Sequence, residues 1–285
     1  MSAATPTPTV LILGATSLIG GYLARDLAEA GTGFTQLGRH PAPLDRGWLQ
    51  ADLTDPDLAA RLPPARLVYS LSPIWLLPQA LPALKAAGMT RLVAFSSTSV
   101  FTKAASGEAS ERAVAARLAG AEADVIAFCE ANDAAWTILR PTLIYDEGRD
   151  GNVSRLAALI RRFGVLPVLG RGEGLRQPVH AQDLARGAMA AAASKAARDR
   201  AYDLPGGETL TYGEMAGRVF DALGRPRRVI ALPPALWRFA FSLARPLLPG
   251  ATAAMGTRMA ADLTFDGGPA RRDFGWAPRA FRPRF

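Results

Sequence analysis

The sequence predicts an α/β fold, in which a Rossmann-type, doubly wound parallel sheet is followed by a smaller, mostly helical lobe. Two observations lead to this prediction. Short apolar runs alternate with segments of helical periodicity, which is typical of βαβ units. After Gly170, Pro and Gly become frequent and helical segments dominate. We therefore expect a sheet domain at residues 1–170 and a lobe at residues 171–285 that is partly interleaved with the sheet.

Each expected element has a local pattern behind it. Strands are expected at the apolar runs Val10–Leu13, Phe34–Leu37, Leu67–Leu71, Leu92–Phe95 and Ile138–Tyr145. Helices are expected where apolar residues recur with helical spacing, at Ile19–Ala30, Ile74–Ala87 and Arg112–Ala131. The lobe has brief extended pieces at Gln177–Val179, Tyr202–Leu204 and Val229–Leu232.

Helix ends carry signals of their own. Gly31 and Gly88 each follow an expected helix and fit the left-handed position at a helix C-terminus. Thr211 and Glu214 have the spacing of a capping box, in which hydroxyl and carboxylate bond each other's free amides. A helix is therefore expected to begin at Thr211.

The composition excludes several classes of protein. One Cys and two His among 285 residues leave no disulfide framework and no Cys/His cluster spaced for zinc. The net charge of +8 is spread from Arg25 to Arg284 and lacks interleaved aromatics, so a solvated surface is expected rather than a nucleic-acid interface. The most apolar stretch, Leu232–Leu248, is interrupted by Pro and Arg and is too short to span a membrane. Because residues 1–9 also lack a secretory signal, we expect a cytoplasmic protein.

A glycine turn follows the first expected strand. The run Gly14-Ala-Thr-Ser-Leu-Ile-Gly20 lies between Val10–Leu13 and a helix, which is the context of a dinucleotide-binding turn. Gly14 would permit the tight turn, and Gly20 would permit close packing of helix on strand. Amides at the helix N-terminus would then bind a pyrophosphate, whereas Ser17 replaces the middle glycine with a hydroxyl donor.

The end of the second strand favours NADP over NAD. A carboxylate there accepts from the free ribose 2′-hydroxyl of NAD, but this chain reads Gly38-Arg39-His40, with no acid before Asp45. The guanidinium of Arg39 suits a 2′-phosphate. Asp52, after the third strand, would either contact the adenine or cap the next turn.

Five segments resemble the extended and atypical short-chain dehydrogenase/reductases, which include the NAD-dependent epimerases and dehydratases of nucleotide sugars. They are Gly14–Gly20, Phe95–Phe101, Leu139–Tyr145, Pro178–Ala185 and Ala270–Trp276, in the expected order along nearly the whole chain. The resemblance implies a Rossmann domain that holds NAD(P), a lobe that holds a small-molecule substrate, and a dimer formed through the helices at 74–87 and 112–131. It also implies a Ser/Thr, Tyr, Lys active site, whose hydroxyl position falls on Ser97.

The Tyr-x-x-x-Lys element of that family is missing here. Ala113 and Arg117 stand in its place, and no tyrosine of the chain is followed four residues later by Lys. Arg117 could hold a ribose hydroxyl, but its pKa is too high to relay a proton. Tyr145 is the first candidate for a replacement acid/base. Weaker candidates are His180, Lys103, Asp146 and Glu147.

These residues give one set of predicted sites. The predicted catalytic residues are Ser97 and Tyr145. The predicted cofactor-binding residues are Gly14, Thr16, Ser17, Leu18, Ile19, Gly20, Arg39, Asp52, Leu53, Ser70, Leu71, Ser96, Arg117 and Pro141. No metal ligand is predicted.

Two hypotheses of function follow from the resemblance. One is an NADP-dependent oxidoreductase or epimerase that acts on a carbonyl or secondary alcohol with an altered proton route. The other is an inactive NADP(H)-binding sensor or accessory subunit, for which the segment Leu236–Arg245 would contact a partner or a membrane surface rather than cover the substrate. A transcriptional regulator ranks last, because no recognition helix is evident.

Overall fold

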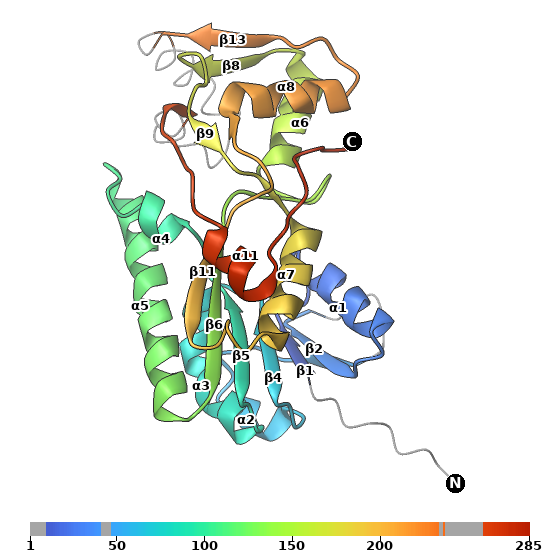
Figure 1. The fold of residues 1–285 in the computed structure, drawn as a ribbon, viewed down its shortest axis with the longest axis vertical. Helices are drawn as coiled ribbons and strands as arrows, with labels where there is room; N and C mark the ends of the chain where they lie inside the picture. The colour runs from blue at the N-terminus through green and yellow to red at the C-terminus, as the bar shows by residue number, and fades with distance from the viewer. Residues whose placement is uncertain (1–9, 41–46, 234–235, 237–258) are drawn as a thin grey trace.

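The computed structural model describes residues 10–40, 47–233, 236 and 259–285, and its central feature is a seven-stranded parallel sheet (Figure 1). The strand order is β11-β6-β5-β4-β1-β2-β3. The strands are β1 (Val10–Leu13), β2 (Phe34–Gly38), β3 (Trp48–Gln50), β4 (Leu67–Ser70), β5 (Arg91–Phe95), β6 (Ala135–Pro141) and β11 (Arg200–Leu204). The direction of winding reverses between β1 and β4, so a ligand crevice is expected at the carboxyl ends of these strands. The predicted fold class is confirmed.

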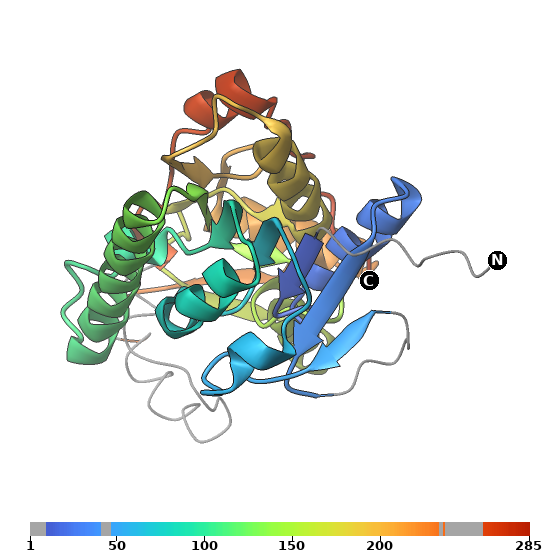
Figure 2. The same cartoon turned by 90° about the horizontal axis from the view of Figure 1, so that it is seen from below.

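Helices cover both faces of the sheet (Figure 2). Leu11 and Leu13 of β1 point into one core, whereas Val10 and Ile12 point into the other, because side chains alternate along a strand. The first core is closed by α2 (Leu58–Arg61), η1 (Ile74–Leu76), α3 (Leu77–Ala86) and α5 (Ala109–Ala131). The second is closed by α1 (Gly20–Glu29), α7 (Ala181–Ala193) and α11 (Gly268–Phe274).

A lobe with its own core lies beyond the carboxyl ends of the strands (Figure 1). It contains α6 (Val153–Phe163), α8 (Tyr212–Ala222) and the strand pairs β8 (Leu166–Leu169) with β13 (Val229–Leu232) and β9 (Leu175–Arg176) with β12 (Leu210–Thr211). A third pair, β7 (Ile144–Tyr145) with β10 (Val179–His180), connects it to the sheet domain. The expected boundary at residue 170 lies inside this lobe, after β8, and the chain returns to the sheet in α7 and β11.

Most local predictions are confirmed in detail. Gly31 and Gly88 have φ angles of +67° and +95°, and Thr211 and Glu214 form the capping box of α8. The apolar run 138–145 is divided, because β6 ends at Pro141 and β7 begins at Ile144. The extended piece expected at 177–179 is also displaced, since β9 ends at Arg176 and β10 begins at Val179.

Some of the predictions fall on residues that the structure does not describe. Residues 1–9, Asp45 and, except for Leu236, the segment 236–245 lie outside the described residues. Within the described parts, no helix has the length and apolar character that a membrane crossing requires.

Candidate cofactor site and active site

The glycine turn has no room for side chains at its two ends. Gly14 has a φ of +70°, and a Cβ there would lie 2.7 Å from the backbone nitrogen of Ser72. A Cβ on Gly20 would lie 2.1 Å from the carbonyl oxygen of Ala15. The turn is held to β2, because the Gly14 amide donates to the Leu37 carbonyl at 3.0 Å. Both predicted glycine positions are therefore required by the backbone path.

Residues between these glycines differ in what they offer a phosphate. Thr16 is exposed, and Ile19 is buried in the core beneath the turn. Ser17 Oγ accepts from the Gly20 amide at 3.2 Å, which leaves the hydroxyl proton of Ser17 available to an anion. The partly buried Leu18 packs against the same core, so it can contribute only its backbone amide to an anion.

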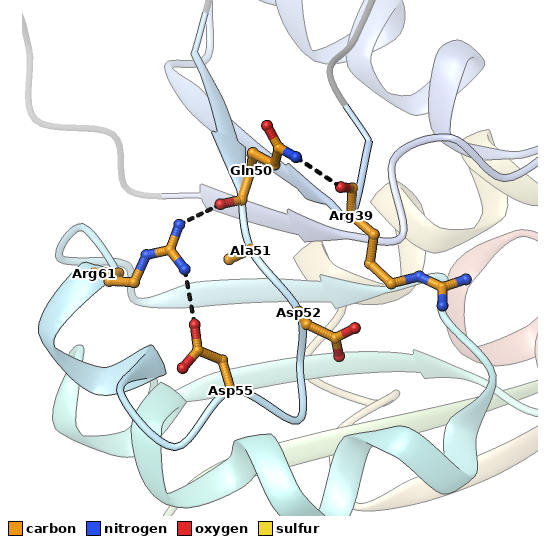
Figure 3. A pocket seen from close by; sticks show the side chains of 6 residues that line it. All are labelled: Arg39, Gln50, Ala51, Asp52, Asp55 and Arg61. Atoms are coloured by element: carbon orange, nitrogen blue, oxygen red, sulfur yellow. Dashed lines mark hydrogen bonds and ion pairs between the residues drawn. The ribbon is translucent and has the colours of Figure 1, made fainter.

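A pocket lies beside the ends of β2 and β3, where the adenosine end of a dinucleotide is expected (Figure 3). It is lined by Arg39, Gln50, Ala51, Asp52, Asp55 and Arg61. The guanidinium of Arg61 donates to Asp55 at 2.8 Å and to the Gln50 carbonyl, so both of its terminal nitrogens are engaged. The side chain of Arg39 extends away from these bonds, and its exposed guanidinium is the cation available to a ligand.

Asp52 has a role in the local turn. Its Oδ1 accepts from the amide and the hydroxyl of Thr54, at 2.9 and 2.8 Å. These two bonds, together with the charge of Arg39, lower the pKa of the Asp52 carboxyl. The turn-capping alternative for Asp52 is thus present, and its contact with adenine stays a prediction. Leu53 is buried in the core behind it.

Two unpartnered hydroxyls lie at the ends of the neighbouring strands β4 and β5. Among the described residues, Ser70 Oγ and Ser96 Oγ are buried and have no hydrogen-bond partner. A buried hydroxyl without a partner costs free energy unless a ligand supplies one. Leu71 and Pro141 are buried beside them. The two hydroxyls and the glycine cradle together fit a dinucleotide that extends along this edge.

Ser97 lies two residues beyond β5, ahead of the short helix α4 (Ser99–Thr102). Its Oγ accepts from the Ser99 amide at 3.1 Å, so its own proton is free to donate to a substrate oxygen. The neighbouring Thr98 is committed, because it is buried and donates to the Pro141 carbonyl at 3.1 Å. Ser97 is therefore partly exposed and able to donate, whereas the Thr98 hydroxyl is not.

The position of the missing tyrosine is occupied by an exposed alanine. Ala113 and Arg117 are both exposed on α5. The Arg117 guanidinium stacks over the ring of Trp75 in η1, with its central carbon 4.5 Å from the ring centroid. This cation–π contact gives Arg117 a protein partner close to the end of β4. Sequence reasoning missed Trp75, because nothing local marks it.

Tyr145 is enclosed by the lobe. It is 1% exposed, and its ring packs edge-on against His180 and Phe281, with centroids 5.0 and 4.9 Å away. Burial raises its pKa well above the ordinary value, with Glu147 adding to the shift. These surroundings favour packing over proton transfer, so its catalytic role stays a prediction.

His180 caps α7. Its Nδ1 accepts from the Gln182 amide at 3.0 Å, so Nε2 carries the proton and contacts Glu147 Oε2 at 3.1 Å. The ligand atoms of Asp146, Glu147 and His180 lie within 4.8 Å of one another, a cluster that the sequence did not indicate. Each of the three groups is already bonded to protein.

A polar network connects the glycine-turn helix to the lobe. Tyr22, two residues after Gly20, donates to Asp146 Oδ1 at 3.0 Å, and Arg149 pairs with the same carboxylate. Tyr22 and Asp146 are separated by 124 positions, so no local pattern predicts their contact. The network fixes the loop after β7 against the start of α1.

Comparisons with known proteins agree with this geometry. The model of the NAD dependent epimerase/dehydratase family matches residues 78–204. The 2-alkyl-3-oxoalkanoate reductase of Stenotrophomonas maltophilia (strain K279a) is 30% identical over 226 residues. The match covers 69% of this chain and 66% of that reductase, just under two thirds of its length.

Solved structures share the fold over most of the chain. MoeE5 in complex with UDP-glucose and NAD has a TM-score of 0.74 and 21% identity, with 95% of this chain and 94% of that chain covered. The UDP-glucuronic acid 4-epimerase of Bacillus cereus, in complex with UDP-glucuronic acid and NAD, has a TM-score of 0.74, 17% identity and the same coverage. The UDP-glucose 4-epimerase of Thermotoga maritima, with UDP-glucose, has a TM-score of 0.73 and 16% identity, again covering 95% and 94%. With the glycine turn and the order of the sheet, these matches lead to one conclusion: residues 78–204 match the NAD dependent epimerase/dehydratase family, and the chain has the fold of the nucleotide-sugar epimerases named above.

Proposed function

We propose that the protein is an NADP(H)-dependent oxidoreductase or epimerase that acts on a carbonyl or secondary alcohol of a small molecule. The observation that carries the proposal is the complete cradle for a dinucleotide. Gly14 and Gly20 admit no Cβ, and the unpartnered hydroxyls of Ser70 and Ser96 lie along the same edge of the sheet.

Arg39 supports NADP in preference to NAD. It is an exposed cation in the pocket beside β2, whereas the other guanidinium there, Arg61, is engaged by Asp55. A 2′-phosphate would form a charge-assisted hydrogen bond with Arg39. Two of the solved neighbours named above were determined with NAD, so this preference is the part of the proposal that most needs a test.

The bound cofactor would supply a hydride, and the protein would orient the substrate. Ser97 would donate a hydrogen bond to the substrate oxygen, since its proton is not used within the protein. The family's acid/base is replaced by Ala113, so the proton would come from water. Loss of a positioned general acid typically slows a reaction about 10²- to 10⁴-fold, so slow turnover is expected.

Carbonyl reduction is the favoured reaction. It rests on the 30% identity to a reductase of 2-alkyl-3-oxoalkanoates. A nucleotide sugar is the alternative substrate, because the neighbours with the same fold hold UDP-glucose or UDP-glucuronic acid. A screen that follows NADPH at 340 nm with 3-oxo acids, together with chromatography for epimerised sugar after incubation with UDP-sugars, would separate the two, because epimerisation consumes no net NADPH.

The first test is a calorimetric titration with NADPH and, separately, with NADH. We expect NADPH to bind more tightly, and Arg39→Asp to reverse the preference, because a carboxylate repels the 2′-phosphate and accepts from a free hydroxyl. Arg66→Asp, at an exposed position before β4, is the matched control and should leave both affinities unchanged. An equal loss of affinity for NADPH and NADH in Arg39→Asp would mean that Arg39 does not bind the 2′-phosphate.

A second candidate function is a protein that binds NADP(H) without turnover, as a sensor or accessory subunit. The stacking of Arg117 on Trp75 favours it, because the residue at the lysine position is held by an aromatic ring. Tight NADPH binding with neither NADPH oxidation nor epimerised sugar in the substrate screen would select this function. Turnover of any carbonyl substrate would exclude it.

A further inference from the structure

We propose that the outer end of the C-terminal lobe docks on the surface of an anionic lipid bilayer. This surface, which we name the lobe end, combines exposed apolar side chains with unpaired cations. It consists of Arg161, Arg162, Phe163, Pro167, Arg225, Arg228 and Ile230. The β8–β13 pair lies at the end of the lobe that faces away from the sheet (Figure 1), so docking would leave the cofactor pocket beside β2 and β3 accessible.

The apolar part of the lobe end contains large side chains that are about half exposed. Phe163 is 51% exposed at the end of α6, and Ile230 is 46% exposed on β13. Ile230 pairs with Pro167 of β8, which is exposed as well, whereas Leu166 and Val168 of β8 point into the lobe core. The strand pair therefore presents an apolar outer face that nothing in the described residues covers.

The charged part consists of four arginines from α6 and from the segment before β13. Arg161, Arg162, Arg225 and Arg228 are all exposed. Among the described residues, the nearby ion pairs are Arg227 with Asp221 and Arg218 with Glu208, and none of the four lobe-end guanidinium groups has a carboxylate within 4.0 Å. Their contacts are to neutral groups, such as the Phe163 ring 5.1 Å from the Arg162 guanidinium and the Ile160 carbonyl 3.2 Å from Arg225 Nη1.

This combination fits a bilayer better than a nucleic acid. Cations near an anionic bilayer each contribute attraction, and apolar side chains beside them insert at the headgroup boundary. A nucleic acid would use several flat aromatic faces for stacking, but Ile230 and Pro167 are aliphatic, and Phe163 is the one aromatic side chain of the lobe end. The charge and the apolar groups are thus complementary to the two parts of a lipid surface.

The test is co-sedimentation of the full chain with vesicles of phosphatidylcholine alone and of phosphatidylcholine with phosphatidylglycerol. We expect binding to the anionic vesicles, weakened by high salt, and little binding to the neutral ones. The double variant Arg162→Glu with Arg228→Glu should reduce this binding about tenfold or more, because each cation near the surface contributes substantially. Phe163→Ser with Ile230→Ser should also reduce it, and thermal melting would check that both variants fold.

A matched control changes the same charge elsewhere. Arg66→Glu with Arg198→Glu alters two exposed arginines that precede strands of the sheet, and it should keep vesicle binding. The proposal is overturned if the wild-type chain does not bind anionic vesicles, or if this control loses as much binding as the lobe-end variant. Retention of an RNA or DNA oligonucleotide by the same surface, without vesicle binding, would also overturn it.

Discussion

Two adjacent glycines, Gly20 and Gly21, have different surroundings and so provide an internal comparison. A Cβ on Gly20 would lie 2.1 Å from a backbone oxygen, whereas a Cβ on Gly21 would meet nothing within 4 Å. Gly20→Ala should therefore destabilise the protein by about 1–3 kcal/mol through overpacking and weaken NADPH binding at least tenfold. Gly21→Ala should keep the affinity and add up to ~1 kcal/mol, because alanine is the better helix former.

Thermal or urea unfolding, together with NADPH titration, checks this pair. Since both substitutions add the same methyl group to neighbouring residues of α1, a difference between them reports the turn itself. Similar behaviour of the two variants would mean that α1 can move away from the turn, and that the close approach of Gly20 to Ala15 is not required for binding.

Ser97 can be tested separately from the cofactor site. Ser97→Ala removes the proposed donor to the substrate oxygen and also the acceptor of the Ser99 amide. If the protein turns over, we expect kcat to fall by a factor of about 10² or more while NADPH affinity stays the same. Ser110→Ala, at an exposed position in α5, is the control. Unchanged turnover in Ser97→Ala would remove this residue from the mechanism.

The glycine-turn helix and the lobe are coupled through one tyrosine–aspartate hydrogen bond. Tyr22→Phe removes the donor to Asp146, a carboxylate whose side chain is 4% exposed. The expected cost is about 1–3 kcal/mol, as for other hydrogen bonds to charged groups, and weaker NADPH binding should accompany it because α1 forms the cofactor cradle. Denaturant unfolding and calorimetry measure the two effects.

Tyr202→Phe is the matched control for Tyr22→Phe. It loses a similar bond, from the hydroxyl of Tyr202 to Asp273 in α11, away from the glycine turn. It should lower stability by a comparable amount and leave NADPH affinity unchanged. If both variants weaken NADPH binding equally, the effect is one of general stability and the coupling of α1 to the lobe is not supported.

Local sequence patterns predicted the helices and strands because neighbouring residues determine where these elements form and end. The apolar run Val10–Leu13, the left-handed Gly31 and the capping box at Thr211 depend on residues a few positions apart, and all three are present. The turn glycines Gly14 and Gly20 were likewise predictable from the residues next to them. The parallel direction of the strands also follows from the alternation of strands and helices, since parallel strands need crossover connections.

Other parts of the candidate site depend on how distant segments meet. Tyr22 meets Asp146 across 124 positions, and Arg117 meets Trp75 only because α5 packs against η1. The lobe was expected to begin at residue 171, but α6 and β8 already contribute residues to its core. The chain passes between the sheet domain and the lobe more than once. Partners of this kind are set by tertiary packing, which no single segment encodes.

All five tyrosines of the chain have raised pKa values, and this gives the whole molecule a distinctive alkaline behaviour. Burial is the first cause for Tyr22, Tyr69, Tyr145, Tyr202 and Tyr212, against an ordinary value of 10.0. The active tyrosine of the family needs a lowered pKa, whereas burial shifts the pKa of each tyrosine of this chain upward. This agrees with the loss of the Tyr-x-x-x-Lys element.

The same shifts predict how stability depends on pH. Because the folded protein keeps its tyrosines protonated to higher pH than the unfolded chain does, the unfolded state releases protons first as the pH rises above about 10. The free energy of unfolding should therefore be unaffected by these groups below pH 10 and should fall progressively above it. Absorbance at 295 nm should show less tyrosinate in the folded protein than in the unfolded chain at pH 10.5, and so an increase on unfolding. A folded protein in which even one tyrosine ionises near pH 8 would contradict this expectation and would reveal the missing acid/base.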